Sequence, residues 1–122
     1  MDALTVEKLA VFYDNKPVIR ISALQIEANA VTVITGPSGS GKSTFLRSIN
    51  RLNECFENCK TTGNIEILLE GTMHNINRYP LEKLRQKAGM VFQHPNVLPV
   101  SIEKNFTIPL GMKRSQAFDL MQ

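Results

Sequence analysis

The chain has 122 residues and a mass of 13.7 kDa, the size of a single domain. Apolar residues make up 43% and charged residues 20%, which excludes a disordered chain, and no apolar run approaches the roughly 20 residues of a membrane-spanning helix. The net charge is only +3 and the basic residues form no dense cluster, so we expect no nucleic-acid partner.

Two cysteines, Cys55 and Cys59, are separated by three residues. No other Cys and no nearby His completes a zinc site with them. The first residues of the chain have neither the positive nor the apolar segment of a signal peptide. These features predict reduced thiols in a cytosolic protein.

The first 30 residues predict an antiparallel β region. Residues 4–13 alternate apolar and polar side chains except for a break in phase at Lys8, and therefore predict a strand with a bulge. A turn is predicted at 14–17 and a second strand over 18–28. Residues 30–35 form a compact β-branched run, which is typical of a strand buried on both faces of a parallel sheet.

A glycine-rich segment follows this run and leads into a predicted helix. Gly36 to Ser43 fits the pattern G-x-x-x-x-G-K-[ST] at every fixed position. Apolar residues then recur at helical spacing as far as Phe56, so we expect a strand, a loop and a helix over residues 31–56. This order is the context that distinguishes a phosphate-binding loop from a chance glycine-rich turn.

The chemistry of polyphosphate accounts for each residue of the loop. Its glycines allow backbone N–H groups to turn towards the phosphates, and the N-terminus of the following helix adds its dipole. Lys42 provides a positive charge for the outer phosphates, and the Ser43 hydroxyl is a hard oxygen ligand for Mg²⁺. We therefore expect a nucleoside triphosphate to be bound by Gly36, Pro37, Ser38, Gly39, Ser40, Gly41, Lys42, Ser43 and Thr44.

The rest of the chain predicts shorter elements. In chain order these are a loop at 58–63, a strand at 64–71, a helix at 80–88 and a short strand at 89–92 that leads into Gln93. Pro80 stands at a favourable first-turn position of its helix. Residues 111–114 predict a loop, and residues 115–122 predict an amphipathic helix without a C-cap signal.

Two segments carry a family resemblance. Residues 34–53 contain Leu-Arg-Ser-Ile-Asn-Arg after the loop, and residues 89–105 contain Phe-Gln-His-Pro followed by Pro-Val-Ser-Ile-Glu-Lys-Asn. With the loop, they resemble the ATP-binding subunits of ABC transporters, especially those of phosphate importers, over residues 4–112. The resemblance implies an α/β fold: a P-loop NTPase core of ABC type with an N-terminal antiparallel β subdomain, incomplete because the helical subdomain and the Walker B half are missing.

The resemblance also implies roles for individual residues. Tyr13 matches the aromatic residue that stacks on adenine in this family, and Val18 would touch the same base. Gln93 matches the glutamine loop, which reaches the Mg²⁺ ion and the attacking water. ATP and Mg²⁺ are thus the implied cofactors, with Lys42 and Gln93 as catalytic residues and with Ser43 and Gln93 as Mg²⁺ ligands.

An assembly follows from the same resemblance. The implied partners are a second ATP-binding subunit and transmembrane permease subunits, and the implied location is the cytoplasmic face of the cell membrane. The intact family member couples ATP hydrolysis to solute import, here of phosphate. Residues 1–30 would form the antiparallel region, residues 31–56 the Walker A unit, residues 64–110 the strand, helix and glutamine loop, and residues 111–122 the start of the helical subdomain.

The sequence contains no Leu-Ser-Gly-Gly-Gln signature, no Walker B strand and no switch His. We therefore expect the chain alone to bind nucleotide without efficient turnover, and the strand at 30–35 to lack the neighbours that the family provides. Two alternatives stay open. One is a non-catalytic module that binds ATP or phosphate, and the other is a small P-loop kinase, which would leave the glutamine-loop segment unexplained.

Overall fold

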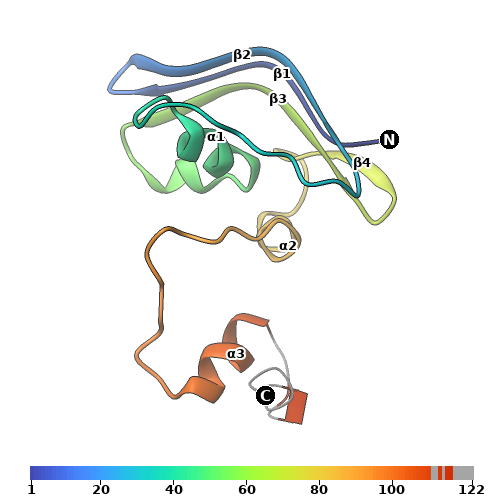
Figure 1. Cartoon of the computed structure of the whole chain (residues 1–122), viewed down its shortest axis with the longest axis vertical. Coiled ribbons are helices and arrows are strands. Elements are labelled where there is room, and N and C mark those ends of the chain that lie inside the picture. The colour runs from blue at the N-terminus through green and yellow to red at the C-terminus, as the bar shows by residue number, and fades with distance from the viewer. Residues whose placement is uncertain (111–112, 114, 117–122) are drawn as a thin grey trace. The chain divides into compact units, whose positions relative to one another are not determined.

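The computed structural model describes residues 1–110, 113, 115 and 116. It divides into two compact units, Met1–Met90 and Val91–Gln122. In the first unit a curved antiparallel sheet runs along one side of the helix that follows the glycine-rich loop (Figure 1).

Four strands form this sheet, in the spatial order β2-β1-β3-β4. Every neighbouring pair is antiparallel, and the strands are β1 (Asp2–Tyr13), β2 (Lys16–Glu27), β3 (Cys59–Leu69) and β4 (Thr72–Asn75). The strands predicted over 4–13 and 18–28 are present as β1 and β2. The predicted strand over 64–71 lies largely within β3, which begins earlier because residues 59–62 pair with the end of β1, so the loop predicted at 58–63 was wrong.

Two tight hairpins connect these strands. Asp14 and Asn15, with φ of 49° and 62°, join β1 to β2 and confirm the predicted turn. Glu70 and Gly71, with φ of 52° and 80°, join β3 to β4. Two consecutive positive φ angles are the mark of the type I′ turn, whose twist matches that of the strands it connects.

The predicted bulge is present in β1. Lys8 has a φ of 50°, and the pairing with β3 passes from Glu7 opposite Asn64 to Ala10 opposite Thr62. Two residues of β1 therefore face the single residue Gly63, which shifts the alternation by one position. As a result, the buried side chains of β1 on both sides of the bulge join one core, and they are Leu4, Val6, Leu9 and Val11.

Helix α1 (Lys42–Ile49) closes this core, with Phe45 buried against the strands. The helix was predicted to continue to Phe56, but the backbone leaves the helical region at Arg51, whose φ is 60°, and resumes as the 3₁₀ turn η1 (Leu52–Cys55). Helix α2 (Leu81–Lys87) agrees with the prediction over 80–88, and its Leu84 is fully buried. Arg85 donates hydrogen bonds to the carbonyl oxygens of Asn50 (3.2 Å) and Arg51 (3.0 Å), just beyond the C-terminus of α1.

Two predicted strands do not form. Residues 30–35 and 89–92 have no strand pairing among the described residues, and Val31 is 93% exposed. A run of β-branched residues favours an extended backbone locally. A strand also needs a neighbouring strand with which to exchange hydrogen bonds. The described sheet is wholly antiparallel and ends at β2 and β4, so it provides no such neighbour.

The second unit contains helix α3 (Ile102–Leu110), which the sequence analysis did not predict. The Ser101 hydroxyl accepts a hydrogen bond from the backbone N–H of Lys104 (3.2 Å) and caps the first turn. Asn105 exchanges hydrogen bonds with the backbone of Leu98, which holds the preceding loop against the helix. The loop and helix predicted at 111–114 and 115–122 lie outside the described residues, except for residues 113, 115 and 116, of which the last two are helical.

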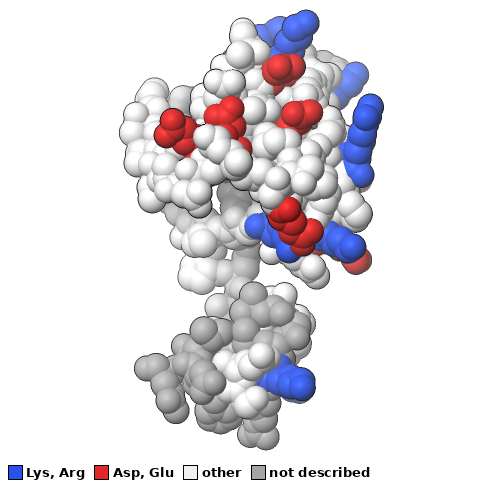
Figure 2. All heavy atoms as spheres, turned by 90° about the vertical axis from the view of Figure 1, so that its right-hand side faces the viewer, with Lys and Arg blue, Asp and Glu red and all other residues white. Residues whose placement is uncertain are grey.

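Charged side chains of both signs occupy the face drawn in Figure 2, where Asp and Glu lie close to Lys and Arg. Among the described residues, Lys and Arg lie mainly along the right-hand edge of this view, and most Asp and Glu lie nearer its centre. Within the described ranges, none of the helices is both long and apolar enough to cross a membrane.

Candidate functional site: the Gly36–Thr44 loop

The glycine-rich loop is an exposed segment that leads directly into α1. Gly41 forms the N-terminal boundary of the helix with a φ of 96°, and its carbonyl oxygen accepts the first helical hydrogen bond, from the N–H of Phe45 (2.9 Å). A Cβ at residue 41 would lie 2.1 Å from Cγ2 of Ile19 on β2. Both the left-handed backbone and the close approach of β2 therefore require glycine at this position.

Lys42 bends back over the loop. Its Nζ donates to the carbonyl oxygens of Gly36 and Pro37, each at 2.7 Å, and to the Ser40 hydroxyl at 3.2 Å. The ammonium group thus lies inside the turn that the sequence pattern predicts as a phosphate cradle. The first turn of α1 contains no acidic residue that would oppose an anion there.

A hollow of about 650 Å³ lies between this loop and β2. Seven residues of β2 line it, five of them apolar, together with residues 32–37, Ser40 to Lys42 and Phe45. Val18 is one of the lining residues, so the structure brings the predicted base-contacting residue to the same hollow as Lys42. A space of this size is within the range of small-molecule sites, which are apolar with a few polar groups.

The two hydroxyl residues after Lys42 differ in exposure. Ser43 is exposed at the N-terminus of α1, where its oxygen is free for a ligand. The side chain of Thr44 is only 6% exposed, and its Oγ1 accepts a hydrogen bond from Nη2 of Arg47 (3.3 Å). The Thr44 hydroxyl is thus hydrogen-bonded within α1, whereas the Ser43 hydroxyl is exposed.

Tyr13 is not among the residues that line the hollow, and it instead contacts Arg47 of α1. Its hydroxyl accepts a hydrogen bond from Nη2 of Arg47 (3.4 Å) and donates one to Oδ1 of Asn53 (3.4 Å). The edge of its ring contacts Phe56, with the ring centroids 6.3 Å apart. Sequence reasoning missed Arg47 and Asn53, although Arg47 stands three residues after Thr44 and so shares its helical face.

Gln93 lies in the second unit, at an exposed bend. Its predicted approach to the loop stays a prediction. Among the described residues, no group of three or more His, Cys, Asp and Glu is arranged to hold a metal ion.

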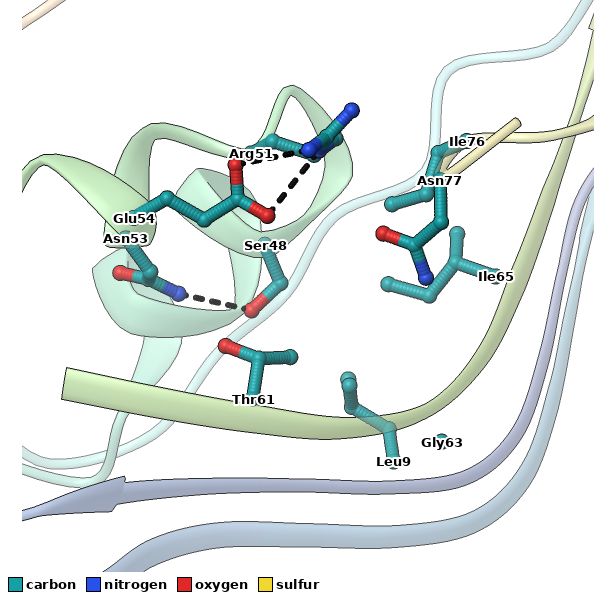
Figure 3. Close-up of a pocket in the computed structure, with 10 residues that line it drawn as sticks. All are labelled: Leu9, Ser48, Arg51, Asn53, Glu54, Thr61, Gly63, Ile65, Ile76 and Asn77. Carbon is teal, nitrogen blue, oxygen red and sulfur yellow. Dashed lines mark hydrogen bonds and ion pairs between the residues drawn. The ribbon is translucent and has the colours of Figure 1, made fainter. Parts of the chain in front are cut away.

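A second, smaller cavity of about 50 Å³ lies beneath α1, between the helix and β3 (Figure 3). Asn53 and Ser48 face it and share a hydrogen bond of 2.9 Å, while the ion pair of Arg51 and Glu54 (3.0 Å) lies beside it. The cavity suits one or two ordered waters and is far too small for a nucleotide. We therefore assign it to packing.

Comparisons with known proteins identify the family of this chain. Residues 19–122 match the family described as ABC transporter. Phosphate import ATP-binding protein PstB 1 of Streptococcus thermophilus is 42% identical over 120 residues, which cover 96% of this chain and 44% of that protein. PstB 2 of Bacillus subtilis is 45% identical over 104 residues, or 85% of this chain and 38% of that protein. The chain spans less than half the length of these relatives, and because the family match extends over residues 19–122, it belongs to the ABC transporter family.

Proposed function

We propose that this protein binds ATP with Mg²⁺ on the Gly36–Thr44 loop and acts as the ATP-binding part of an importer. In the proposed role, ATP hydrolysis drives the uptake of phosphate, because the similar proteins are named phosphate import ATP-binding proteins. The observation that carries the proposal is the position of Lys42 Nζ inside the loop, at the N-terminus of α1. A polyphosphate there gains a point charge, backbone N–H groups and the helix dipole together.

Individual residues would have distinct roles. Lys42 would bind the outer phosphates, and the backbone of residues 36–41 would surround them. Ser43 would hold Mg²⁺ through its exposed hydroxyl, which is the hard oxygen donor that this ion prefers, and Gln93 would be a further oxygen donor. The ion supplies charge neutralisation for phosphoryl transfer when it is bound.

The base would be recognised by residues of the first two strands, Tyr13 on β1 and Val18 on β2. Val18 offers an apolar contact from the hollow, and Tyr13 offers an aromatic face at the end of β1. An aromatic face binds a flat base at little entropic cost, because its side chain has only two rotatable bonds.

Hydrolysis would need partners. We propose a second ATP-binding subunit, which supplies a signature segment over the nucleotide, and permease subunits that the glutamine-loop region contacts. The Walker B acids are not in the 122-residue sequence, so the chain alone would bind nucleotide without efficient turnover.

Equilibrium binding of ATP, with and without Mg²⁺, tests this proposal. Lys42→Ala removes the point charge and is expected to weaken ATP binding by about a hundredfold, because hydrogen bonds to charged groups contribute the most. Lys83→Ala removes an exposed lysine on α2 and is the matched control. Equal affinity of the Lys42→Ala variant and the parent chain would overturn the assignment of the loop, and fast ATP turnover by the parent chain would overturn the partner requirement.

A further inference from the structure

Arg47 lies at the centre of a polar cluster that also contains Tyr13, Thr44, Asn53 and Phe56, here called the Arg47 cluster. Its Nη2 donates to Tyr13 (3.4 Å) and Thr44 (3.3 Å), and its Nε donates to Oδ1 of Asn53 (3.3 Å). The guanidinium carbon also stands 5.6 Å from the centre of the Phe56 ring. One side chain thus contacts the end of β1, the helix α1 and the turn η1.

The Asn53 end of this cluster is fixed. Asn53 is only 1% exposed, and its Nδ2 donates to the carbonyl oxygen of Thr44 (3.0 Å) and to Oγ of Ser48 (2.9 Å). Its Oδ1 is the acceptor that Arg47 and Tyr13 share. A buried amide whose donors are all bonded has one orientation. The position of Oδ1, to which Arg47 and Tyr13 donate, is therefore fixed.

The Tyr13 end of the cluster is held less firmly on its own. Tyr13 is half-buried at the last position of β1, directly before the hairpin turn. Its ring packs against the hydrophobic core and meets Phe56 in an edge contact, at an interplanar angle of 67°. The two hydrogen bonds of its hydroxyl add to this packing in fixing the direction of the ring, and Arg47 provides one of them.

We propose that Arg47 is a positioning residue that fixes the Tyr13 ring for the base of the bound nucleotide. The proposal rests on the proposed function, because it assumes that Tyr13 contacts the base. Arg47 also bonds to Thr44, which follows Ser43 at the start of α1, so it sets the distance between the base contact and the phosphate-binding loop. The planar guanidinium suits this role because it donates in several fixed directions at once, which an ammonium group does not.

A purely structural role predicts a different outcome. If Arg47 only stabilised the fold, its loss would lower the melting temperature and weaken all ligands alike. If Arg47 positions Tyr13, its loss weakens ATP binding and leaves the binding of inorganic tripolyphosphate, which has no base, almost unchanged.

A double-mutant cycle with the full chain separates these outcomes. Arg47→Gln is expected to weaken ATP binding on the order of tenfold, as the loss of one hydrogen bond to a charged group does, and to change tripolyphosphate binding less than about twofold. In the Tyr13→Ala background, Arg47→Gln is expected to cause no further loss of ATP binding. Additive losses, or equal losses for the two ligands, would overturn the proposal. Arg78→Gln, at an exposed arginine, controls for the lost charge.

A spectroscopic signature provides a second readout. The chain has no Trp and only two Tyr residues, so in a Tyr79→Phe background the near-ultraviolet circular dichroism of tyrosine reports on Tyr13 alone. Arg47→Gln is expected to reduce that signal, and an unchanged signal would contradict the positioning role. Should Arg47→Gln not fold, Arg47→Lys and Tyr13→Phe test the same contacts, each with an expected several-fold loss of ATP binding and with tripolyphosphate binding retained.

The two proposals fail separately. If Tyr13→Ala leaves ATP affinity unchanged while Lys42→Ala abolishes binding, the loop is the nucleotide site and the positioning role of Arg47 is wrong. If Lys42→Ala also leaves the affinity unchanged, the nucleotide site itself is wrong.

Discussion

The carbonyl oxygen of Lys8 faces Gly63 across the bulge of β1, and a Cβ on residue 63 would lie 2.3 Å from it. Gly63 also has a φ of 106°. The bulge keeps the apolar side chains before and after it in one core. The close approach of the two strands at the bulge therefore leaves no room for a side chain at residue 63.

We predict that Gly63→Ala destabilises the protein by about 3 kcal/mol, because the methyl group meets rigid backbone at an unfavourable φ. Denaturant unfolding measures the change. Gly71→Ala is the matched control, since Gly71 has a φ of 80° but open space around it, and about 1 kcal/mol is expected there. Equal losses for the two variants would show that the contact with Lys8 is unimportant.

Asn53→Ala is predicted to lower stability by about 2–3 kcal/mol. The change deletes the buried amide that bonds to Thr44 and Ser48, and it leaves the Thr44 carbonyl with one partner fewer. The same unfolding measurement applies, and Asn77→Ala, at an exposed asparagine beside the same small cavity, is expected to stay within about 0.5 kcal/mol of the parent. A cost at Asn53 no larger than at Asn77 would contradict the bonding described for the Arg47 cluster.

Arg85→Met is expected to cost about 1–2 kcal/mol. The guanidinium of Arg85 donates hydrogen bonds to two carbonyl oxygens after the last turn of α1, where its positive charge is also attracted to the negative end of the helix dipole. Arg78→Met, on the surface, removes an equal charge without such contacts. Hydrogen exchange of the α1 amides should accelerate in the first variant only, and the capping role is refuted if both variants behave alike.

The pair Glu70 and Lys87, whose charged atoms are 2.7 Å apart, gives a prediction for pH. The hydrogen bond and charge of Lys87 lower the pKa of Glu70, and those of Glu70 raise the pKa of Lys87. The stabilisation is therefore present above the ordinary range of a carboxyl and below that of a lysine, between about pH 5 and pH 10. It is lost as the pH falls through the pKa of Glu70 or rises through that of Lys87.

Because both groups are exposed, the effect should be small. Glu70→Gln is expected to lower the melting temperature at pH 7 by about 3 °C or less, and the difference should disappear once the pH has fallen through the lowered pKa of Glu70. Glu57→Gln is the control for a lost surface charge. A difference that persisted at pH 2.5 would have to come from something other than this ion pair.

Local patterns in the sequence were sufficient to predict several features. The phase break at Lys8 indicated the bulge, since a bulge is an extra residue in an alternating strand. The segment from Gly36 to Ser43 was recognisable because each fixed position of its pattern has its own chemical constraint. The turn predicted at 14–17 was also found, and its two central residues, Asp14 and Asn15, are of types that tolerate the positive φ observed there.

Features that depend on distant partners were not predictable in this way. Residues 30–35 have the composition of a strand, yet composition does not supply a neighbour. The contact of Tyr13 with Arg47 joins positions 34 residues apart, and it exists only because β1 ends beside α1. Helix α3 was not predicted, because it is short and contains Pro109, a residue that disfavours the interior of a helix. Ser101, a typical N-cap residue, was the sequence feature that could have indicated its start.

Lys42 makes three hydrogen bonds to the loop that it belongs to. A free lysine side chain loses up to about 2 kcal/mol of rotamer entropy when it is ordered. Here that loss has already occurred during folding, so an arriving phosphate does not have to immobilise the side chain. Instead the phosphate must replace the carbonyl oxygens of Gly36 and Pro37 as the partner of Lys42 Nζ. The contribution of Lys42 to phosphate affinity is therefore the difference between two sets of hydrogen bonds to one ammonium group.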